Sequence, residues 1–201
     1  MKTPNQEQVW DDIAQEWHEF KQIPAEKSKE FLKKCSGNIL DLGSGSGRYL
    51  MKIKKSKLYL VDFSQKMLDL AKQKAEKQKI KAEFIKADLT KLPFENNFFD
   101  YALSISALHC IKGQTKRKKS LKELYRVLKP KAKACIGVWN ENSKRFNKKK
   151  GKELLIGWRD KGKRYYYLHN EQEIHKMFQD AGFKILSTHN SEMMINFIVE
   201  K

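Results

Sequence analysis

Residues 39–50 read ILDLGSGSGRYL, and this stretch decides the fold. It begins with a short apolar run of the kind that forms a buried strand, and it continues into a turn in which glycine alternates with serine. Gly43, Gly45 and Gly47 allow a tight turn and let backbone N–H groups come close to a ligand. The pattern therefore predicts a strand that ends in a ligand-binding loop.

The segments around this loop alternate between strands and helices. Apolar runs predict strands over residues 38–41, 58–61, 83–87, 99–104, 133–139, 183–187 and 194–199. Helical spacing of apolar residues predicts helices over residues 6–20, 25–34, 48–53, from 64 onward, 116–128 and 170–181. The alternation favours the α/β class: a Rossmann-like, seven-stranded, mostly parallel sheet with an antiparallel edge strand and helices on both faces.

The length of the chain fits one domain. It has 201 residues and a mass of 23.7 kDa. We expect residues 1–201 to form a single domain, with an N-terminal helical segment at 1–36 and a basic insertion at 140–168. No apolar run reaches the roughly 18 residues that a bilayer span needs, and residues 1–20 do not resemble a secretory signal. These features predict a cytoplasmic protein that has no membrane partner.

The three cysteines, Cys35, Cys110 and Cys135, are widely spaced. No two of them have the close C-x-x-C spacing of a zinc or redox site. We therefore expect free thiols and no bound metal.

The charge of the chain indicates a polyanionic partner. Lys+Arg number 42 and Asp+Glu number 24, so the formal net charge is +18. The basic residues gather in two segments, residues 112–119 and 144–152. A surface of this kind attracts phosphates and releases counterions on binding, which favours a nucleic acid. The alternative is a compositional bias toward lysine, for example one that follows adaptation to heat.

Acidic or polar residues stand at the ends of the first four predicted strands. Ligands bind at this edge of an open α/β sheet. Asp62 is placed to accept hydrogen bonds from the hydroxyls of a ribose, and Asp88 is placed to accept one from the exocyclic amine of an adenine. Residues 104–106 lie beside the place where the reaction is expected. Asp41 would repel a pyrophosphate, whereas it would attract the ammonium and sulfonium of S-adenosylmethionine. Each feature alone also fits a structural turn, a helix cap or a surface acid, but the set favours a nucleoside-type cofactor.

Four stretches of the chain resemble class I S-adenosylmethionine-dependent methyltransferases: ILDLGSGSGRYL, LVDFS, KADLTKLPFENNFFDYALSISALHCI and LKELYRVLKP. The resemblance runs from about Val9 to Val199. Within this superfamily the chain is most similar to the tRNA methyltransferases that esterify 5-carboxymethyluridine at the wobble position, including the domain fused to an AlkB-type dioxygenase. This narrower match rests on VWDDIAQEW, SISALHCI, Val138-Trp139 and, above all, KRYYYLHNEQEIHKMFQDAGF from Lys163.

The resemblance implies S-adenosylmethionine as cofactor, S-adenosylhomocysteine as product and a carboxylate in the tRNA anticodon loop as acceptor. It implies cofactor contacts from residues at the strand ends: Asp41, Gly43, Ser44, Gly45, Gly47, Asp62, Phe63, Asp88, Leu89 and Ser104. It also implies catalytic roles for His109, Arg164 and Tyr165. It implies substrate contacts from Lys116, Arg117, Trp139 and Arg145. A small zinc-finger-type activator subunit is the expected partner in a heterodimer.

The chain departs from that family at three places. Cys110 stands where a second histidine is usual, Lys131-Ala132 where two glycines are usual, and residues 21–24 replace a longer Pro-Trp-Pro segment. His109 at a helix start and Trp139 in a strand are also compatible with purely structural roles.

The expected reaction is a direct displacement, because a carboxylate is already ionised at neutral pH and needs no strong base. The elements typical of cysteine-based or amino-group methylation do not accompany Cys110 or residues 104–109. Three other functions remain open from the sequence: a small-molecule or protein methyltransferase of the same fold, a non-catalytic RNA-binding subunit, and a dinucleotide oxidoreductase.

Overall fold

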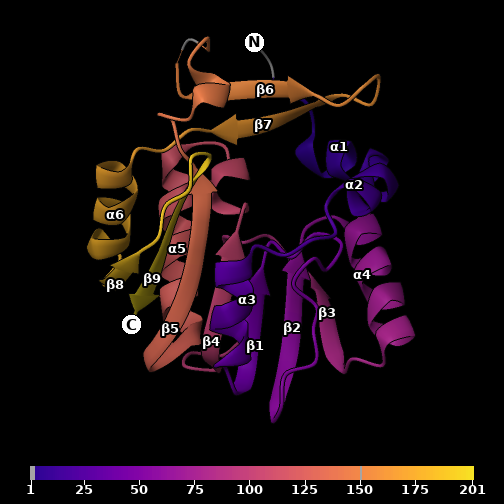
Figure 1. The fold of residues 1–201 in the computed structure, drawn as a ribbon, viewed down its shortest axis with the longest axis vertical. Coiled ribbons are helices and arrows are strands. Elements are labelled where there is room, and N and C mark those ends of the chain that lie inside the picture. The colour runs from indigo at the N-terminus through magenta and orange to yellow at the C-terminus, as the bar shows by residue number, and fades with distance from the viewer. Residues whose placement is uncertain (1–2, 150) are drawn as a thin grey trace.

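A seven-stranded sheet forms the centre of the computed structural model, which describes residues 3–149 and 151–201 (Figure 1). The strands lie in the order β3-β2-β1-β4-β5-β9-β8. Their bounds are β1 Gly37–Leu42, β2 Ser56–Asp62, β3 Ala82–Lys86, β4 Phe99–Ile105, β5 Leu128–Trp139, β8 Lys184–Thr188 and β9 Met194–Glu200. The order reverses direction at β1, so the carboxyl ends of β1 and β4 open onto the switch point at which ligands bind in this fold.

The predicted sheet is confirmed, including its antiparallel pairing at one edge. Strands β1 to β5 pair in parallel, whereas β9 runs antiparallel to both β5 and β8. The strand that runs antiparallel to the rest of the sheet, β9, is therefore second from the edge, and β8 is the edge strand. The parallel strands place the glycine loop, Asp62 and Ser104 at the same end of the sheet.

Helices cover both faces of the sheet, as the alternating pattern predicted. Along β1, Leu40 and Leu42 pack with residues of α5 (Gln114–Val127) and α6 (Glu171–Asp180), whereas Ile39 packs with residues of α3 (Glu26–Lys33) and α4 (Gln65–Gln78). Figure 1 shows α3 in front of the sheet and α5 behind it. Successive strand residues point to opposite faces, which is why this near-continuous apolar run serves both cores.

A cap lies above the carboxyl ends of the strands. It consists of helices α1 (Gln6–Asp12) and α2 (Ala14–Phe20) and of an antiparallel hairpin of β6 (Glu153–Gly157) and β7 (Lys163–Tyr167). Figure 1 shows the hairpin crossing the top of the sheet to reach α1 and α2. Two short 3-10 helices, η1 (Leu108–Cys110) and η2 (Lys144–Phe146), connect the sheet to this layer.

Polar side chains of α1 and α2 hold the cap together. Gln6 on α1 donates from Nε2 to the carbonyl of Lys163 at 3.2 Å, and its Oε1 accepts from the N–H of Tyr165 at 2.6 Å. Glu16 on α2 accepts from the indole N–H of Trp158 at 2.6 Å and forms an ion pair with Lys161 at 2.6 Å. The N-terminal helices and the hairpin therefore form one connected layer.

Three local predictions differ from the structure. The expected helix at residues 6–20 breaks at Ile13, which has ψ near 0° and ends α1 before α2 begins. The helix expected at residues 48–53 is wrong: the glycine loop continues as turns, with Leu50 N–H donating to the Gly47 carbonyl at 3.2 Å. The region at 140–168, expected only as a basic insertion, contains the β6–β7 hairpin.

Candidate functional site

A large cavity lies between the strand ends and the cap. Its volume is about 1280 Å³, which exceeds the roughly 300–1,000 Å³ of ordinary small-molecule pockets. The sheet contributes the glycine loop and the acids at the carboxyl ends of β1, β2 and β3, and the cap contributes aromatic and basic side chains. A cavity of this size has room for a nucleoside cofactor and for part of a second substrate.

The glycine loop is held against β2 by its own backbone. The N–H groups of Gly43 and Ser44 both donate to the carbonyl of Val61, at 2.8 and 3.1 Å. Gly43 has φ +75°, and a Cβ at this position would lie 2.3 Å from the Cβ of Ala107. Only glycine fits a position that needs both left-handed backbone and this close approach. The loop therefore presents its open side to the cavity.

Asp62 fixes the loop from the end of β2. Its Oδ2 accepts from the N–H of Gly45 at 2.8 Å, and its Oδ1 accepts from the N–H of Ser64 at 3.0 Å. Burial raises the pKa of Asp62 to about 6, although the backbone N–H groups oppose this shift. Each carboxylate oxygen keeps a free lone pair, so Asp62 can still accept from the hydroxyls of a ligand.

Asp41 is the more strongly perturbed of the two acids. Burial raises its pKa to about 7, and the nearby cations Arg48 and Lys74 only partly oppose the effect of burial. A buried carboxylate without a direct ion pair favours a cationic ligand, because the charge of the ligand would compensate its own. This is the environment that an ammonium or sulfonium group would require.

The Asp41→Asn variant should therefore lose a pH dependence that the native protein has. In the native protein, affinity for S-adenosylmethionine should rise about tenfold from pH 6 to pH 8, as Asp41 loses its proton. The pKa of Asp41 is higher in the folded state than in the unfolded state. The free energy of unfolding should therefore fall as pH rises from about 4 to 7, because Asp41 loses its proton more readily when the chain is unfolded. In Asp41→Asn this contribution to the pH dependence should be absent. Calorimetric titrations and thermal melts across this range would check both signs. A native affinity that is flat with pH would contradict the assignment.

Two buried hydroxyls in the cavity wall fit the expected cofactor. The side-chain oxygens of Ser44 and Tyr49 are buried, and neither has a hydrogen-bond partner among the described residues. Buried polar atoms are normally paired, so these two hydroxyls are suited to bind a polar group of a ligand. Together with Asp41 and Asp62 they make the loop end of the cavity suitable for a polar, positively charged nucleoside.

The opposite end of the cavity contains a buried cation, Arg164. It is 5% exposed, and its guanidinium carbon lies within 6 Å of four ring centroids, those of Trp10, Trp17, Trp158 and Tyr166. Nη1 donates to the hydroxyl of Tyr166 at 2.9 Å. Burial lowers the pKa of Arg164. No carboxylate of the described residues forms an ion pair with it, and its Nε has no partner.

His109, on η1, packs against the rings of Trp139 and Tyr166 and is a neutral hydrogen-bond donor. Its Nδ1 accepts from the backbone N–H of Trp139 at 2.9 Å, so the ring proton is on Nε2. Burial lowers the pKa of His109 to about 3, and the ring is therefore neutral at physiological pH. Nε2 is buried without a partner, and His109 lines the cavity. The residue can donate one hydrogen bond to a ligand without adding charge.

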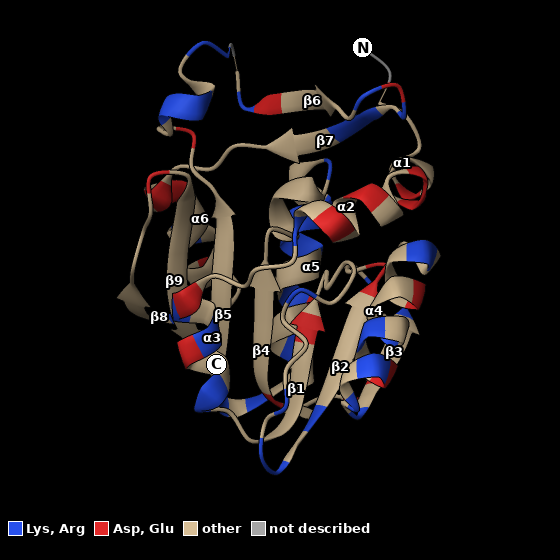
Figure 2. Cartoon of the chain, turned by 45° about the vertical axis from the view of Figure 1, so that its right-hand side comes forward, with Lys and Arg blue, Asp and Glu red and all other residues tan. Residues whose placement is uncertain are grey.

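An aromatic stack and further cations complete the cap end. Trp139 stacks on Tyr166 with ring centroids 4.1 Å apart, and Arg145 lies over Trp139 at 5.3 Å. The ammonium of Lys21 is close enough to Arg48, Arg145 and Arg164 for their charges to lower its pKa, although burial is the larger cause. The cavity is thus acidic at the loop end and cationic at the cap end. Figure 2 shows basic residues along β7 and around η2, above the strand ends.

The thiol of Cys110 is held in its neutral form. It lies at 3.5 Å from the carbonyl of Ser106, and burial raises its pKa far above the usual value. A neutral thiol is a poor nucleophile, in agreement with a reaction that does not proceed through cysteine. All three cysteines are free, and no group of metal-binding side chains occurs among residues 3–149 and 151–201.

Most residues predicted for the site line the cavity, and four do not. Those that do are Asp41, Gly43, Ser44, Gly45, Asp62, Phe63, Asp88, Leu89, His109, Lys116, Trp139, Arg145 and Arg164. Asp88 lies exposed at the rim, where its Oδ1 accepts from the N–H of Thr90 at 2.8 Å. The four outside the lining are Gly47, Ser104, Arg117 and Tyr165.

Packing explains why these four lie elsewhere. Gly47 contacts the interior, where a Cβ would lie 2.6 Å from Leu50. Ser104 is buried within β4. Arg117 is buried, stacks on Tyr167 at 3.7 Å and donates to the Ile111 carbonyl at 3.0 Å. Tyr165 follows Arg164 on β7 and points to the other face of the hairpin. Direct ligand contacts from these residues stay predictions.

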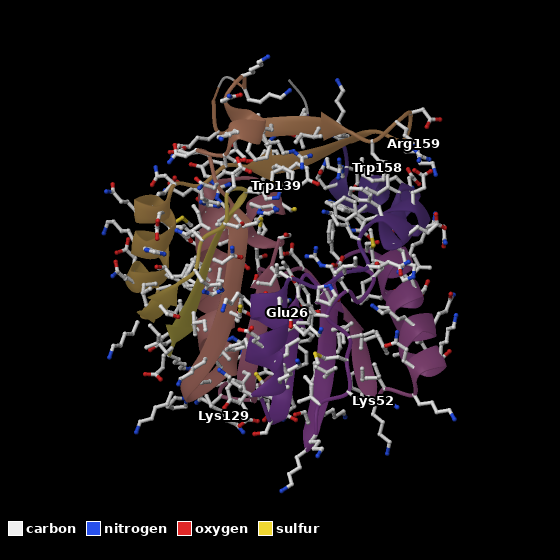
Figure 3. The ribbon with its side chains drawn as sticks, in the orientation of Figure 1. Glu26, Lys52, Lys129, Trp139, Trp158 and Arg159 are labelled. Atoms are coloured by element: carbon white, nitrogen blue, oxygen red, sulfur yellow. The ribbon has the colours of Figure 1, made fainter. Side chains whose placement is uncertain are left out.

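The aromatic part of the cap was not predicted from the sequence. Trp10, Trp17, Trp158 and Tyr166 all line the cavity. Trp139 and Trp158, labelled in Figure 3, both lie below the hairpin. Trp10 and Trp17 have the helical spacing of ordinary core residues. The available signal was that all four tryptophans lie in the first helices or in residues 139–158, beside the basic segment 144–152.

Comparison with protein families gives a match to the methyltransferase domain over residues 39–131. This range holds the glycine loop and the strand-end acids that line the cavity. Over residues 3–149 and 151–201, no helix combines the length and apolar character that a membrane span requires.

Curated relatives include proteins with different acceptors. The chain is 28% identical to a protein of Encephalitozoon cuniculi described as a methyltransferase, over 81% of this chain and 78% of that protein. It is 33% identical to the tRNA (carboxymethyluridine(34)-5-O)-methyltransferase of Arabidopsis thaliana, over 65% of this chain and 31% of the relative. It is 34% identical to the 2-phytyl-1,4-naphtoquinone methyltransferase of Nostoc punctiforme, over 65% of this chain and 53% of the relative. The chain thus spans only part of the two relatives whose acceptor is named.

Solved structures share the fold. The structure of an S-adenosylmethionine-dependent methyltransferase from Aquifex aeolicus superposes with a TM-score of 0.68 at 25% identity, covering 91% of this chain and 92% of the other. The methyltransferase of a complex with the Trm112 methyltransferase activator, from Haloferax volcanii, superposes with a TM-score of 0.72 at 16% identity, covering 99% and 97%.

Proposed function

Because the chain belongs to the class I S-adenosylmethionine-dependent methyltransferases, we propose that it transfers the methyl group of this cofactor to a carboxylate, that of 5-carboxymethyluridine at the wobble position of tRNA. The cofactor belongs at the loop end of the cavity, with Asp41, Asp62 and the hydroxyls of Ser44 and Tyr49. The acceptor belongs at the cap end, beside Arg164 and His109.

The observation that supports a carboxylate acceptor is the buried guanidinium of Arg164, which donates to the Tyr166 hydroxyl and to the Gly157 carbonyl but has no carboxylate partner among the described residues. A buried charge without a counter-ion is costly, and an anionic ligand at this position would remove the cost. The planar guanidinium also matches the two oxygens of a carboxylate. A neutral quinone acceptor, as the name of the Nostoc punctiforme relative implies for that protein, would leave Arg164 without a counter-charge.

The proposed mechanism needs positioning more than proton transfer. Bound S-adenosylmethionine supplies an activated methyl group on sulfur, with a neutral thioether as leaving group. Arg164 would hold one side of the acceptor carboxylate, and the Nε2–H of His109 would orient it. A carboxylate oxygen held in this way would be able to accept the methyl group without an added base, and the electron pair of the S–CH₃ bond would stay with the leaving thioether. The aromatic cap excludes water and fixes the approach, which is the main catalytic contribution available here.

Basic residues at the cavity mouth support an RNA substrate. Lys116 and Arg145 are exposed and line the cavity, so both can meet phosphates of a loop whose target base has entered it. Aromatic rings beside cations suit unpaired bases better than a duplex. The tRNA relatives and the net charge of +18 support the same substrate class. A cytoplasmic location stays a prediction of the sequence.

Alkali lability of the product tests the acceptor. A tRNA anticodon stem-loop with 5-carboxymethyluridine at the wobble position should acquire label from methyl-labelled S-adenosylmethionine. Brief mild alkali should then release the label as volatile methanol, because a methyl ester hydrolyses whereas methyl groups on ring nitrogen, ring carbon or ribose oxygen do not. A stem-loop methylated on a ring nitrogen is the control. Label that survives alkali would contradict the carboxylate acceptor.

We also propose a heterodimer with a small activator subunit. The support is the antiparallel edge of the sheet, where β8 has a free side and Leu186 is 38% exposed, and the fold shared with the activator-bound methyltransferase of Haloferax volcanii. Co-expression with a Trm112-type protein should give a one-to-one complex in size-exclusion chromatography. A chain that stays monomeric and fully active in its presence would count against this partner.

A further inference from the structure

The mouth of the cavity carries an exposed aromatic ring. Phe20, the last residue of α2, is 63% exposed and lines the cavity. Its ring lies against the rings of Trp158 and Trp17, with centroids 5.6 and 6.1 Å away, and these contacts leave most of its surface open. The next exposed apolar residue, Ile23, follows three positions later and is 87% exposed. The buried rings of the cap thus continue outward to an exposed ring at the entrance.

Positive charge lies directly beside this ring. The ammonium of Lys21 is 4.8 Å from the centroid of the Phe20 ring. The same ammonium is close enough to Arg145 and Arg164 for their charges to lower its pKa. A chain of cations therefore leads from the exposed ring to the proposed position of the acceptor.

We propose that Phe20 forms a stacking subsite for the nucleobase next to the target nucleotide, with Lys21 meeting the phosphate that joins the two. This inference rests on the proposed function, since it assumes that the acceptor base enters beside Arg164. An unpaired base has a flat face that stacks on an aromatic ring, and its backbone carries the negative charge that Lys21 requires. One occupant thus satisfies both the apolar and the charged parts of the mouth.

A protein segment fits the mouth less well. An apolar peptide would cover Phe20 and Ile23, but it would leave the cluster of Lys21, Arg145 and Arg164 without a counter-charge. The nucleotide chain supplies one phosphate for each base, so one exposed ring beside one cation at the mouth matches one base and its phosphate.

The test uses an anticodon stem-loop with 2-aminopurine beside the wobble position, bound in the presence of S-adenosylhomocysteine. Stacking should quench the fluorescence of the 2-aminopurine. The Phe20→Ala variant should lose this quenching and bind the stem-loop 5- to 100-fold more weakly, whereas Phe20→Trp should restore both. Ile23→Ala, which removes an exposed apolar side chain three positions after Phe20 and outside the cavity lining, is the matched control and should behave as the native protein.

A second measurement separates this subsite from the acceptor. The ratio of kcat/KM for the stem-loop to kcat/KM for free 5-carboxymethyluridine should fall in Phe20→Ala by the same factor as the binding. If no RNA is methylated but the quenching still depends on Phe20, the proposed acceptor is wrong and the subsite stands. Equal quenching in the native protein and in Phe20→Ala, or no binding of the stem-loop to the native protein, would overturn the subsite.

Discussion

The Arg164→Met variant should lose about 100- to 1000-fold in kcat/KM for the stem-loop while binding S-adenosylmethionine with unchanged affinity. Removing one partner of a buried charge pair costs several kcal/mol, because the other partner, here the acceptor carboxylate, loses its counter-charge. The cofactor is proposed to bind at the loop end, and so it should be indifferent to the change. Steady-state kinetics and calorimetric titration with the cofactor would measure the two effects.

Two further variants make the Arg164 result specific. Arg164→Lys keeps the charge but loses the planar fork, so it should recover part of the activity. Arg159→Met removes a cation of the same hairpin whose side chain is 71% exposed and paired with Glu16, and it should change kcat/KM by less than about twofold. If Arg159→Met is as damaging as Arg164→Met, the effect belongs to the charge of the hairpin and not to a carboxylate site.

The folded state should tolerate the loss of Arg164. The methionine side chain fits among aromatic rings, and it removes a buried charge that has no ion pair with a carboxylate of the described residues. Against this, the hydroxyl of Tyr166 loses the hydrogen bond it accepts at 2.9 Å. These effects oppose each other, so thermal melts should show a change in unfolding free energy of less than about 2 kcal/mol. Arg164 would then contribute mainly to the reaction and little to the stability of the fold.

The loop end of the site could be predicted from the sequence because its geometry is local. Asp41 ends one predicted strand, Asp62 and Asp88 directly follow the next two, and parallel strands bring their carboxyl ends to one edge of the sheet. The pattern of strands alone therefore places these residues together. What it could not give was their environment: the raised pKa values of Asp41 and Asp62 depend on burial by the surrounding fold.

The cap end could not be derived in the same way, because its contacts join distant parts of the chain. The rings around Arg164 come from Trp10 and Trp17 in the first helices and from Trp158 and Tyr166 in the hairpin. No local periodicity connects these segments, and the hairpin itself lies in a region whose lysines obscure the strand pattern. The resemblance to a family identified Arg164. That it is a buried cation without a carboxylate partner among the described residues follows only from the arrangement of the cap around it.

Alternation along one strand explains which neighbours of Arg164 belong to the site. In β7, Arg164 and Tyr166 face the cavity, whereas Tyr165 between them is buried on the other face of the hairpin. A motif read as a block of letters assigns all of these residues to the substrate. A strand divides them into two sets, and only the set that contains Arg164 meets the cavity.

The Asp62→Asn variant should bind S-adenosylhomocysteine about 10- to 100-fold more weakly than the native protein. Asp62 is placed to accept from ribose hydroxyls, and hydrogen bonds to a charged group contribute about 1.5–3 kcal/mol. The amide keeps the size of the side chain, but its NH₂ group cannot accept from the N–H of Gly45 or Ser64, so one of these two bonds is lost as well. Calorimetric titration gives the affinity directly.

A cofactor analogue separates the ribose contact from damage to the loop. The 2′-deoxy analogue of S-adenosylhomocysteine should bind the native protein more weakly than the parent compound, and the difference should vanish in Asp62→Asn, since the partner of the missing hydroxyl is already gone. Asp69→Asn, a change at an exposed carboxylate of α4, is the control and should leave both affinities unchanged. If the analogue is penalised equally in the native protein and in Asp62→Asn, then Asp62 acts only by holding Gly45 and Ser64, and the ribose is bound by another group.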